Sequence, residues 1–184
     1  MKGQRVTMKQ FKLGRIAEVE MSATPMALVG SAVLWLLLFI LARIFLTLTM
    51  AEAILGSLLA VALHWIGEIV HQLGHAWAAR RTGYPMRGIR LGPLAVLAVA
   101  LYPRDEPELP ANIHIRRALG GPAASLLFAL VTAVVAFLLR DASEFWRVLS
   151  LFYALENLLV FTLGALLPLG FTDGSTLLYW WPRR

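Results

Sequence analysis

Four apolar stretches dominate the chain, and each is long enough to cross a membrane as a helix. The first has about 23 residues, which rise roughly 35 Å as an α-helix and so exceed the ~30 Å hydrocarbon core of a bilayer. This pattern predicts an all-α integral membrane protein with about four transmembrane helices. The stretches run from about Met26 to Leu48, Ile54 to Ala79, Ile115 to Leu139 and Val148 to Leu169.

A shorter apolar segment, Gly88 to Pro103, lies between the second and third stretches. It is too short to cross as a helix between two ends on the same side of the membrane. Val96 and Val99 favour extended structure, and Gly92-Pro93 favours a turn. A re-entrant, hairpin-like loop packed against protein would satisfy its backbone groups. An interfacial amphipathic stretch explains the segment equally well.

The composition also indicates a membrane protein. Of 184 residues, 59% are hydrophobic and 15% are charged, with a mean hydropathy of +0.69. Soluble domains carry about 25% charged residues. There is no cysteine, which excludes disulfides and thiolate metal sites, so a bound metal would need His, Asp or Glu.

The net charge of +6 is distributed unevenly over the predicted topology. Fourteen of the 17 lysines and arginines lie before the first stretch, between the second and third, at the entrance of the third, or at the C-terminal end. Cytoplasmic segments of membrane proteins are enriched in these residues. We therefore expect a multi-pass protein with both termini in the cytoplasm. The basic charge would orient the chain in the lipid bilayer, and we expect no nucleic-acid partner.

Two regions follow from this topology. Residues 1–25 form a basic cytoplasmic tail, in which an interfacial helix over Phe11 to Met21 is one option. Residues 26–184 form the transmembrane core, with no internal repeat.

The second apolar stretch carries a polar stripe, which is costly inside a membrane and usually functional. At about 100° per residue, three histidines and a glutamate fall within roughly 60° of one another, with a glutamine beside them. Two histidines four residues apart can bind one metal ion from one helix face. Hydrogen bonds to neighbouring helices are the alternative, but this spacing favours a metal. The stripe consists of His64, Glu68, His71, Gln72 and His75.

A zinc site needs a third protein ligand, and Asp173 is the candidate. The second and fourth stretches run in the same direction, so Asp173 would reach a depth similar to that of His71 and His75. Local sequence alone favours another role, as the N-cap of a short helix from Gly174 to Trp181.

Three segments, taken in order, resemble the site-2 protease family of intramembrane zinc metalloproteases. The segment "HQLGHAWAARRTGYP" is similar to the family's H-E-x-x-H helix. "RRALGGPAASLL" resembles its Gly-Pro segment, and "LLPLGFTDGSTLL" resembles its N-x-x-P-x4-D-G element, with Pro168, Asp173 and Gly174 in register. The resemblance covers roughly Ala51 to Tyr179.

The resemblance implies Zn²⁺ on His71, His75 and Asp173, and cleavage of substrate transmembrane segments. It implies that the apolar loop after the second stretch is a strand region that can pair with an extended substrate. Glu68 and His64 would lie in a second shell around the metal. A groove for a substrate or partner helix would involve Gly121, Pro122, Ser125 and Pro168.

Three positions depart from the family pattern. Gln72 stands where the family has its catalytic glutamate, and Ser125 and Ala165 stand where it has asparagines. Asn157 matches another family asparagine or serves in interhelical hydrogen bonding. An engineered Glu→Gln exchange would explain Gln72 alone, so the other two departures favour a natural, degenerate relative.

Gln72 decides the expected chemistry. A glutamine amide cannot take up and return a proton, so the general base of hydrolysis is missing although the metal ligands remain. We expect a zinc metalloprotease-like protein that is inactive as written. The alternative is a pseudoprotease that serves as a structural or helix-binding subunit of a membrane complex. A third option makes Glu68, one turn before His71, the source of the carboxylate.

A redox protein is a further class. Its haem could use His64, His71 or His75, with His114 as the remaining histidine elsewhere, or Glu68 and His71 could form half of a di-iron site. Di-iron bundles use two Glu-x-x-His motifs, and this sequence has no second one. The redox class therefore ranks below the other two.

Overall fold

The computed structural model describes residues 10–184 and contains four helices that are long and apolar enough to cross a membrane. These helices correspond to the four predicted stretches, with ends that differ by a few residues. Lys2, Arg5 and Lys9 of the predicted basic tail lie outside the described residues. The helices are α1 (Pro25–Phe45), α2 (Met50–Arg81), α3 (Ala111–Leu138) and α4 (Glu144–Leu158), the last continuing as a π-helical turn, η1 (Leu159–Leu163), and a 3₁₀ turn, η2 (Gly164–Leu166).

Local signals explain where the helices begin. Pro25 opens α1, where its missing N–H costs no helical hydrogen bond. Helix α2 starts with a capping box: the Thr49 side chain accepts from the Glu52 N–H, and the Glu52 carboxylate accepts from the Thr49 N–H. This cap extends α2 four residues beyond the predicted start at Ile54.

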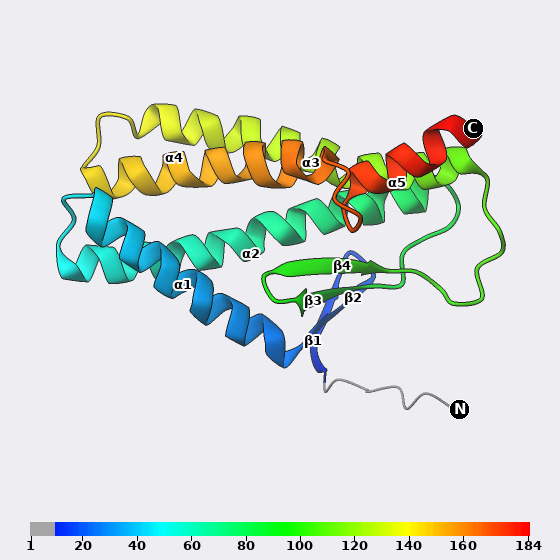
Figure 1. Cartoon of the computed structure of the whole chain (residues 1–184), viewed down its shortest axis with the longest axis horizontal. Coiled ribbons are helices and arrows are strands. Elements are labelled where there is room, and N and C mark those ends of the chain that lie inside the picture. Colours follow the sequence, from blue (N-terminus) through cyan, green and yellow to red (C-terminus); the bar gives the residue numbers. More distant parts are fainter. Residues whose placement is uncertain (1–9) are drawn as a thin grey trace.

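Helices α2, α3 and α4 run side by side along the long axis of the molecule, and α1 crosses α2 obliquely (Figure 1). The α1–α2 and α3–α4 connections lie together at one end, where the Thr47 hydroxyl donates to Glu144. The last helix, α5 (Asp173–Trp180), followed by η3 (Trp181–Arg183), lies at the other end.

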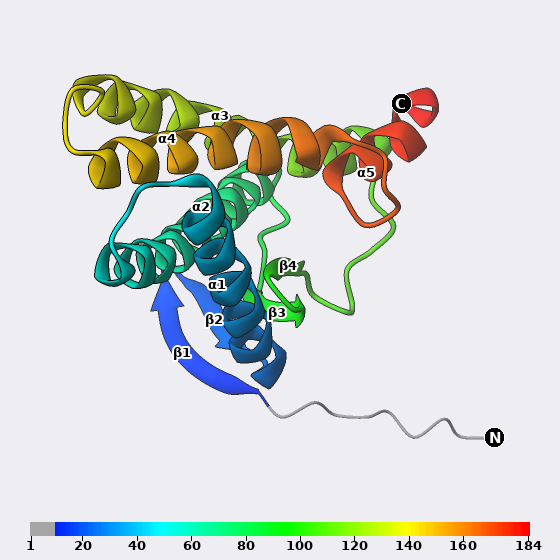
Figure 2. The same cartoon turned by 60° about the vertical axis from the view of Figure 1, so that its left-hand side comes forward.

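The structure also contains a four-stranded sheet, so the prediction of an all-α protein is wrong in this respect. The strand order is β1-β2-β3-β4, with antiparallel outer pairs and a parallel central pair. The sheet lies on the side of α2 away from α3 and α4 (Figure 2). The strands are β1 (Phe11–Ile16), β2 (Val19–Ala23), β3 (Gly88–Leu94) and β4 (Leu97–Leu101).

Strands β1 and β2 occupy the segment where an interfacial helix was an option, and that option is wrong. Val19 and Met21 are buried while Glu20 between them is exposed, which is the two-residue period of a strand. Ala17 and Glu18 both adopt positive φ between the strands. Two such residues form the tight turn that matches the twist of a hairpin.

Strands β3 and β4 form the hairpin that was one of two options for the apolar loop. Its turn docks against α1 without intervening side chains. A Cβ on Gly92, which has a φ of +77°, would lie 2.4 Å from the Cβ of Ala27. A Cβ on Gly30 would lie 2.6 Å from the Ala95 carbonyl carbon. Glycine is therefore required at both positions for this close approach.

A hydrophobic core joins the sheet to α2. Ile89 of β3 is fully buried and Ala98 of β4 nearly so, and both pack with Ala76 and Ala79 of α2. This packing sets β4 against the polar stripe of α2, which carries the candidate site.

Candidate metal centre

The polar stripe of α2 is buried along its whole length. His64, Glu68, His71, Gln72 and His75 each expose less than a tenth of their surface. Small residues on the same helix let its neighbours approach. A Cβ on Gly67 would lie 2.6 Å from the Phe161 ring of η1, and a Cβ on Gly74 would lie 2.3 Å from the Gly120 carbonyl oxygen of α3. The stripe is therefore enclosed by α3, η1 and β4.

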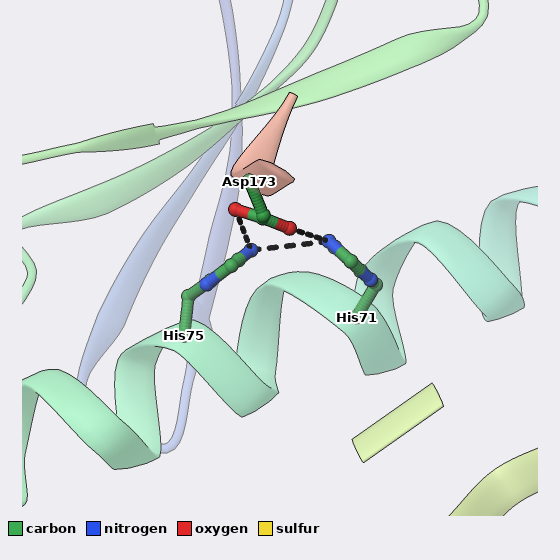
Figure 3. A group of neighbouring side chains, drawn as sticks. All are labelled: His71, His75 and Asp173. Carbon is green, nitrogen blue, oxygen red and sulfur yellow. Dashed lines mark hydrogen bonds and ion pairs between the residues drawn. The ribbon is translucent and has the colours of Figure 1, made fainter. Parts of the chain in front are cut away.

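His71, His75 and Asp173 converge on one point, although Asp173 lies about a hundred residues further along the chain (Figure 3). The two histidine Nε2 atoms are 3.0 Å apart. Asp173 Oδ2 lies 3.2 Å from His71 Nε2, and Oδ1 lies 3.3 Å from His75 Nε2. Ligand atoms about 2.0–2.1 Å from a tetrahedral zinc ion lie about 3.3 Å from one another. The three side chains therefore have the spacing of a zinc site.

The outer nitrogens of both rings have partners. His75 Nδ1 donates to the Arg117 carbonyl oxygen at 2.8 Å, and His71 Nδ1 lies 3.0 Å from the Ser125 hydroxyl. The Arg117 carbonyl can only accept, so a neutral His75 ring carries its hydrogen on Nδ1 and has a lone pair at Nε2; the Ser125 hydroxyl can accept from His71 Nδ1 in the same way. Two converging lone pairs beside a carboxylate repel one another unless a cation lies between them. Second-shell contacts of this kind are typical of metal-binding histidines.

Gly121 of α3 makes room for this arrangement. A Cβ at this position would lie 2.3 Å from His75 Nε2 and 2.5 Å from His71 Nε2. Any other residue would intrude on the two nitrogens that would bind a metal. This close approach to the candidate metal ligands explains the glycine of the Gly121-Pro122 pair.

Asp173 is the first residue of α5, and Thr172 occupies the N-cap position. The local expectation that Asp173 caps this helix is therefore wrong, because its carboxylate contacts the histidines instead. Burial acts to raise the pKa of Asp173, but its contacts with His71 and His75 outweigh burial and hold that pKa below its ordinary value. An ionised carboxylate is the form that a metal ion binds.

The Gln72 side chain is directed at strand β4. Its Nε2 donates to the Ala98 carbonyl oxygen at 3.2 Å. Its Oε1 is buried and has no hydrogen-bond partner among residues 10–184. Glu68, one turn earlier, neighbours the Gln72 side chain and the Ala98 N–H. It is not a member of the ligand group.

His64 lies further along α2 and connects three elements. Its Nε2 donates to the Val96 carbonyl oxygen at 2.8 Å, and its Nδ1 lies 2.8 Å from Glu156 of α4. Because Nε2 carries one hydrogen, a second proton lies between His64 Nδ1 and the Glu156 carboxylate. The pair has no net charge, whichever of these two groups holds that proton. Both ring nitrogens have partners, so His64 is not free to bind haem. The ring of His114 stacks on Trp180 at 4.2 Å and is not part of the ligand group.

A cavity of about 680 Å³ adjoins the candidate ligands His71, His75 and Asp173. Polar groups of α2 line one side of it, and apolar side chains of β4, η1 and the segment before α5 line another. Polar side chains from the start of α3, among them His114 and Arg117, also border it. The four residues expected along a substrate groove do not line this cavity. Gly121, Pro122 and Ser125 are buried within α3, and Pro168 is exposed outside it. Ala165, by contrast, borders the cavity.

Several residues of this region were missed by the sequence analysis. Glu156 could have been found, because a lone acidic residue in an apolar helix is unusual. Phe161 packs on the His64 ring at 5.4 Å, and the buried Arg117 pairs with Glu106. No local sequence signal marks Phe161 or Arg117 as part of this region.

Comparisons with known proteins concern the fold. No protein-family model matches the chain, and no curated protein matches it. Among solved structures, the chain is similar to the Site-2 Protease from Methanocaldococcus jannaschii, with a TM-score of 0.60 and 18% sequence identity. The similarity covers 92% of this chain and 70% of that chain. With its four apolar helices, the chain therefore shares the fold of a site-2 protease.

Proposed function

We propose that the chain is a zinc-binding membrane protein of the site-2 protease type in which peptide hydrolysis is lost or very slow. The observation that carries this proposal is the convergence of His71, His75 and Asp173 beside an amide, Gln72, where a carboxylate base is needed. Both termini would lie in the cytoplasm, and the apolar outer faces of the helices would contact the lipid bilayer.

The residues present fit zinc. His71 and His75 would bind it through Nε2 and Asp173 through its carboxylate, which is a ligand set that zinc accepts. Zinc, when bound, supplies a Lewis acid that polarises a peptide carbonyl. Ser125 and the Arg117 backbone would hold the two rings in the binding orientation.

The missing step is proton transfer. Gln72 cannot accept a proton from water and return it to the leaving amine, and loss of a positioned base costs about 10²–10⁴-fold in rate. Glu68 is the remaining carboxylate of the stripe. It borders the same cavity but is displaced one turn along α2.

The test compares the chain with Gln72→Glu, using Asp173→Asn as the metal-ligand control. Bound zinc is measured on purified protein, and cleavage is measured on single-span membrane substrates. We expect zinc in the chain and in Gln72→Glu, depletion in Asp173→Asn, and cleavage only in Gln72→Glu.

Two other outcomes would contradict parts of this proposal. Cleavage by the unaltered chain that disappears in Glu68→Gln would make Glu68 the base and end the proposal of lost hydrolysis. Absence of zinc from both the chain and Gln72→Glu would leave a structural relative without a metal centre.

A non-catalytic, helix-binding subunit is the second candidate function. The cavity supports it, because its size and its apolar lining from Leu97, Val99 and Phe171 suit part of a partner's transmembrane segment. We expect Ala100→Trp, which fills the cavity, to weaken binding of a fluorescent single-span peptide. Leu127→Trp, on the outer face of α3, is the matched control. Equal binding by both variants would contradict this candidate.

A further inference from the structure

Strand β4 is the last strand of the sheet, so one of its edges has no strand neighbour among residues 10–184. The other edge pairs with β3, where the Leu101 carbonyl accepts from the Arg87 N–H at 2.8 Å. Successive residues of a strand direct their backbone groups to alternate sides, so Ala98 and Ala100 direct theirs away from β3. An unpaired edge of this kind is a template for another extended chain.

This edge is occupied at Ala98 by a side chain of α2. Gln72 Nε2 donates to the Ala98 carbonyl oxygen, and both residues are buried. The amide stands where the N–H of a neighbouring strand would otherwise donate. Adjacent strands are spaced about 4.8 Å apart, so this contact leaves no room for a strand between Ala98 and Gln72.

The hairpin is also held at its turn. The Val96 carbonyl, two residues before Ala98, accepts from His64. Two groups on one face of α2 thus hold two carbonyls on one edge of the hairpin. His64 is anchored in turn by Glu156.

We propose that Gln72 is a tether whose amide N–H keeps the free edge of β4 closed against α2. An extended peptide can then pair with β4 at Ala98 only after this hydrogen bond breaks. A glutamate at position 72 has no N–H to donate, and it would place a second carboxylate beside Glu68. The amide therefore has a positioning role here that is separate from the absence of a base.

The test is amide hydrogen exchange, followed by mass spectrometry, on the full chain in lipid nanodiscs. Gln72→Met keeps the length of the side chain but removes the donor. We expect exchange in residues 94–102 to become about tenfold faster, which corresponds to the loss of one buried hydrogen bond. Thr132→Val is the matched control, since the buried Thr132 hydroxyl donates to Phe128 of its own helix, α3.

Two further variants separate loss of the donor from repulsion between charges. Gln72→Glu should accelerate exchange in the hairpin at least as much as Gln72→Met. The double variant Glu68→Gln/Gln72→Glu removes the pair of carboxylates but does not restore a donor at position 72. We expect its hairpin exchange to stay close to that of Gln72→Met.

Three outcomes would overturn the proposal. The first is hairpin exchange in Gln72→Met that equals that of the unaltered chain. The second is equal acceleration in residues 123–135 of α3, which would indicate general destabilisation. The third is full recovery in the double variant. None of these measurements involves zinc or cleavage, so the tether can fail while the proposed function stands, and the reverse.

Discussion

At the scale of single residues, the geometry of the candidate metal centre depends on groups that would not touch the metal. His71 and His75 each have one ring nitrogen at the centre and one bonded to α3. Gly121 leaves the space in which the two Nε2 atoms meet. The orientation of the ligands is thus set by α3, although the ligands themselves lie on α2 and α5.

Ser125→Ala should weaken zinc binding by about 10–100-fold, because His71 Nδ1 loses the partner that fixes its ring. Competition with a chelator of known affinity measures this effect. Ser57→Ala is the control, since Ser57 is also buried but its hydroxyl bonds to its own helix. Equal zinc affinity in the two variants would show that Ser125 does not support the ligand.

At the scale of elements, α2 and α3 approach each other through glycines. A Cβ on Gly120 would lie 2.5 Å from the Gly74 carbonyl oxygen, and a Cβ on Gly74 would lie 2.3 Å from the Gly120 carbonyl oxygen. Small residues at helix crossings are typical of membrane proteins, because packing rather than the hydrophobic effect holds such helices together.

Gly74→Ala should lower the free energy of unfolding by about 1–3 kcal/mol, because the added methyl group forces the two backbones apart. Unfolding by denaturant in detergent micelles measures this change. Gly56→Ala on the same helix is the control: its Cβ would lie 3.2 Å from the Phe145 ring, a side chain that can shift. Comparable losses in both variants would contradict the close α2–α3 contact.

The segment between β4 and α3 is held by an ion pair. Arg117 donates to Glu106 at 2.9 Å and to the Tyr84 carbonyl oxygen, and it lies over the Tyr102 ring at 4.2 Å. The same residue supplies the carbonyl that holds His75. The loop and the candidate metal centre are therefore coupled through Arg117.

Hydrogen bonds from Arg117 hold the pKa of Glu106 below its ordinary value of 4.5. A lowered pKa in the folded state means that the contribution of the pair is complete above about pH 4.5 and is lost as the pH falls through the folded value. We expect thermal stability to fall less steeply below pH 4.5 in Glu106→Gln than in the unaltered chain. Glu108→Gln, an exposed neighbour, should keep the full decline. Identical pH profiles for all three proteins would exclude a role for the pair.

At the scale of the whole molecule, the arrangement of the helices agrees with the expected topology. The α1–α2 and α3–α4 connections lie at one end, and the start of α3 lies with α5 at the other end (Figure 1). The cytoplasmic location of the termini stays a prediction from the distribution of arginine and lysine.

The chain has no cysteine, so single introduced cysteines report its orientation. Asp105 and Asp141 are both exposed, on the β4–α3 and α3–α4 connections. We expect an impermeant maleimide added outside intact cells to label Asp141→Cys but not Asp105→Cys. Cell lysis should make Asp105→Cys reactive. The reverse pattern would invert the proposed topology.

The helices, which depend on local periodicity, were predicted from the sequence. The four-stranded sheet, which depends on pairing between distant segments, was not. Each transmembrane stretch is predominantly apolar along its whole length, so its helix is predictable without knowledge of its neighbours. The sheet is different, because β2 pairs with β3 more than sixty residues away and only packing against α2 shows which face of each strand is buried. Residues 11–23 alternate between apolar and polar positions, as strands do. A short basic segment with several apolar residues also suits an interfacial helix, so the alternation did not decide between the two.

The sequence by itself determined the four helices and the face of α2 on which His71 and His75 lie together, because both follow from the 3.6-residue repeat. The sequence also offered Asp173 as a third ligand but left open its role as a helix cap. Tertiary structure decided that Asp173 meets these histidines, that Ser125 and Gly121 shape their surroundings, and that Gln72 bonds to strand β4. Those contacts join segments tens of residues apart, so they exist only once the helices and the sheet have packed.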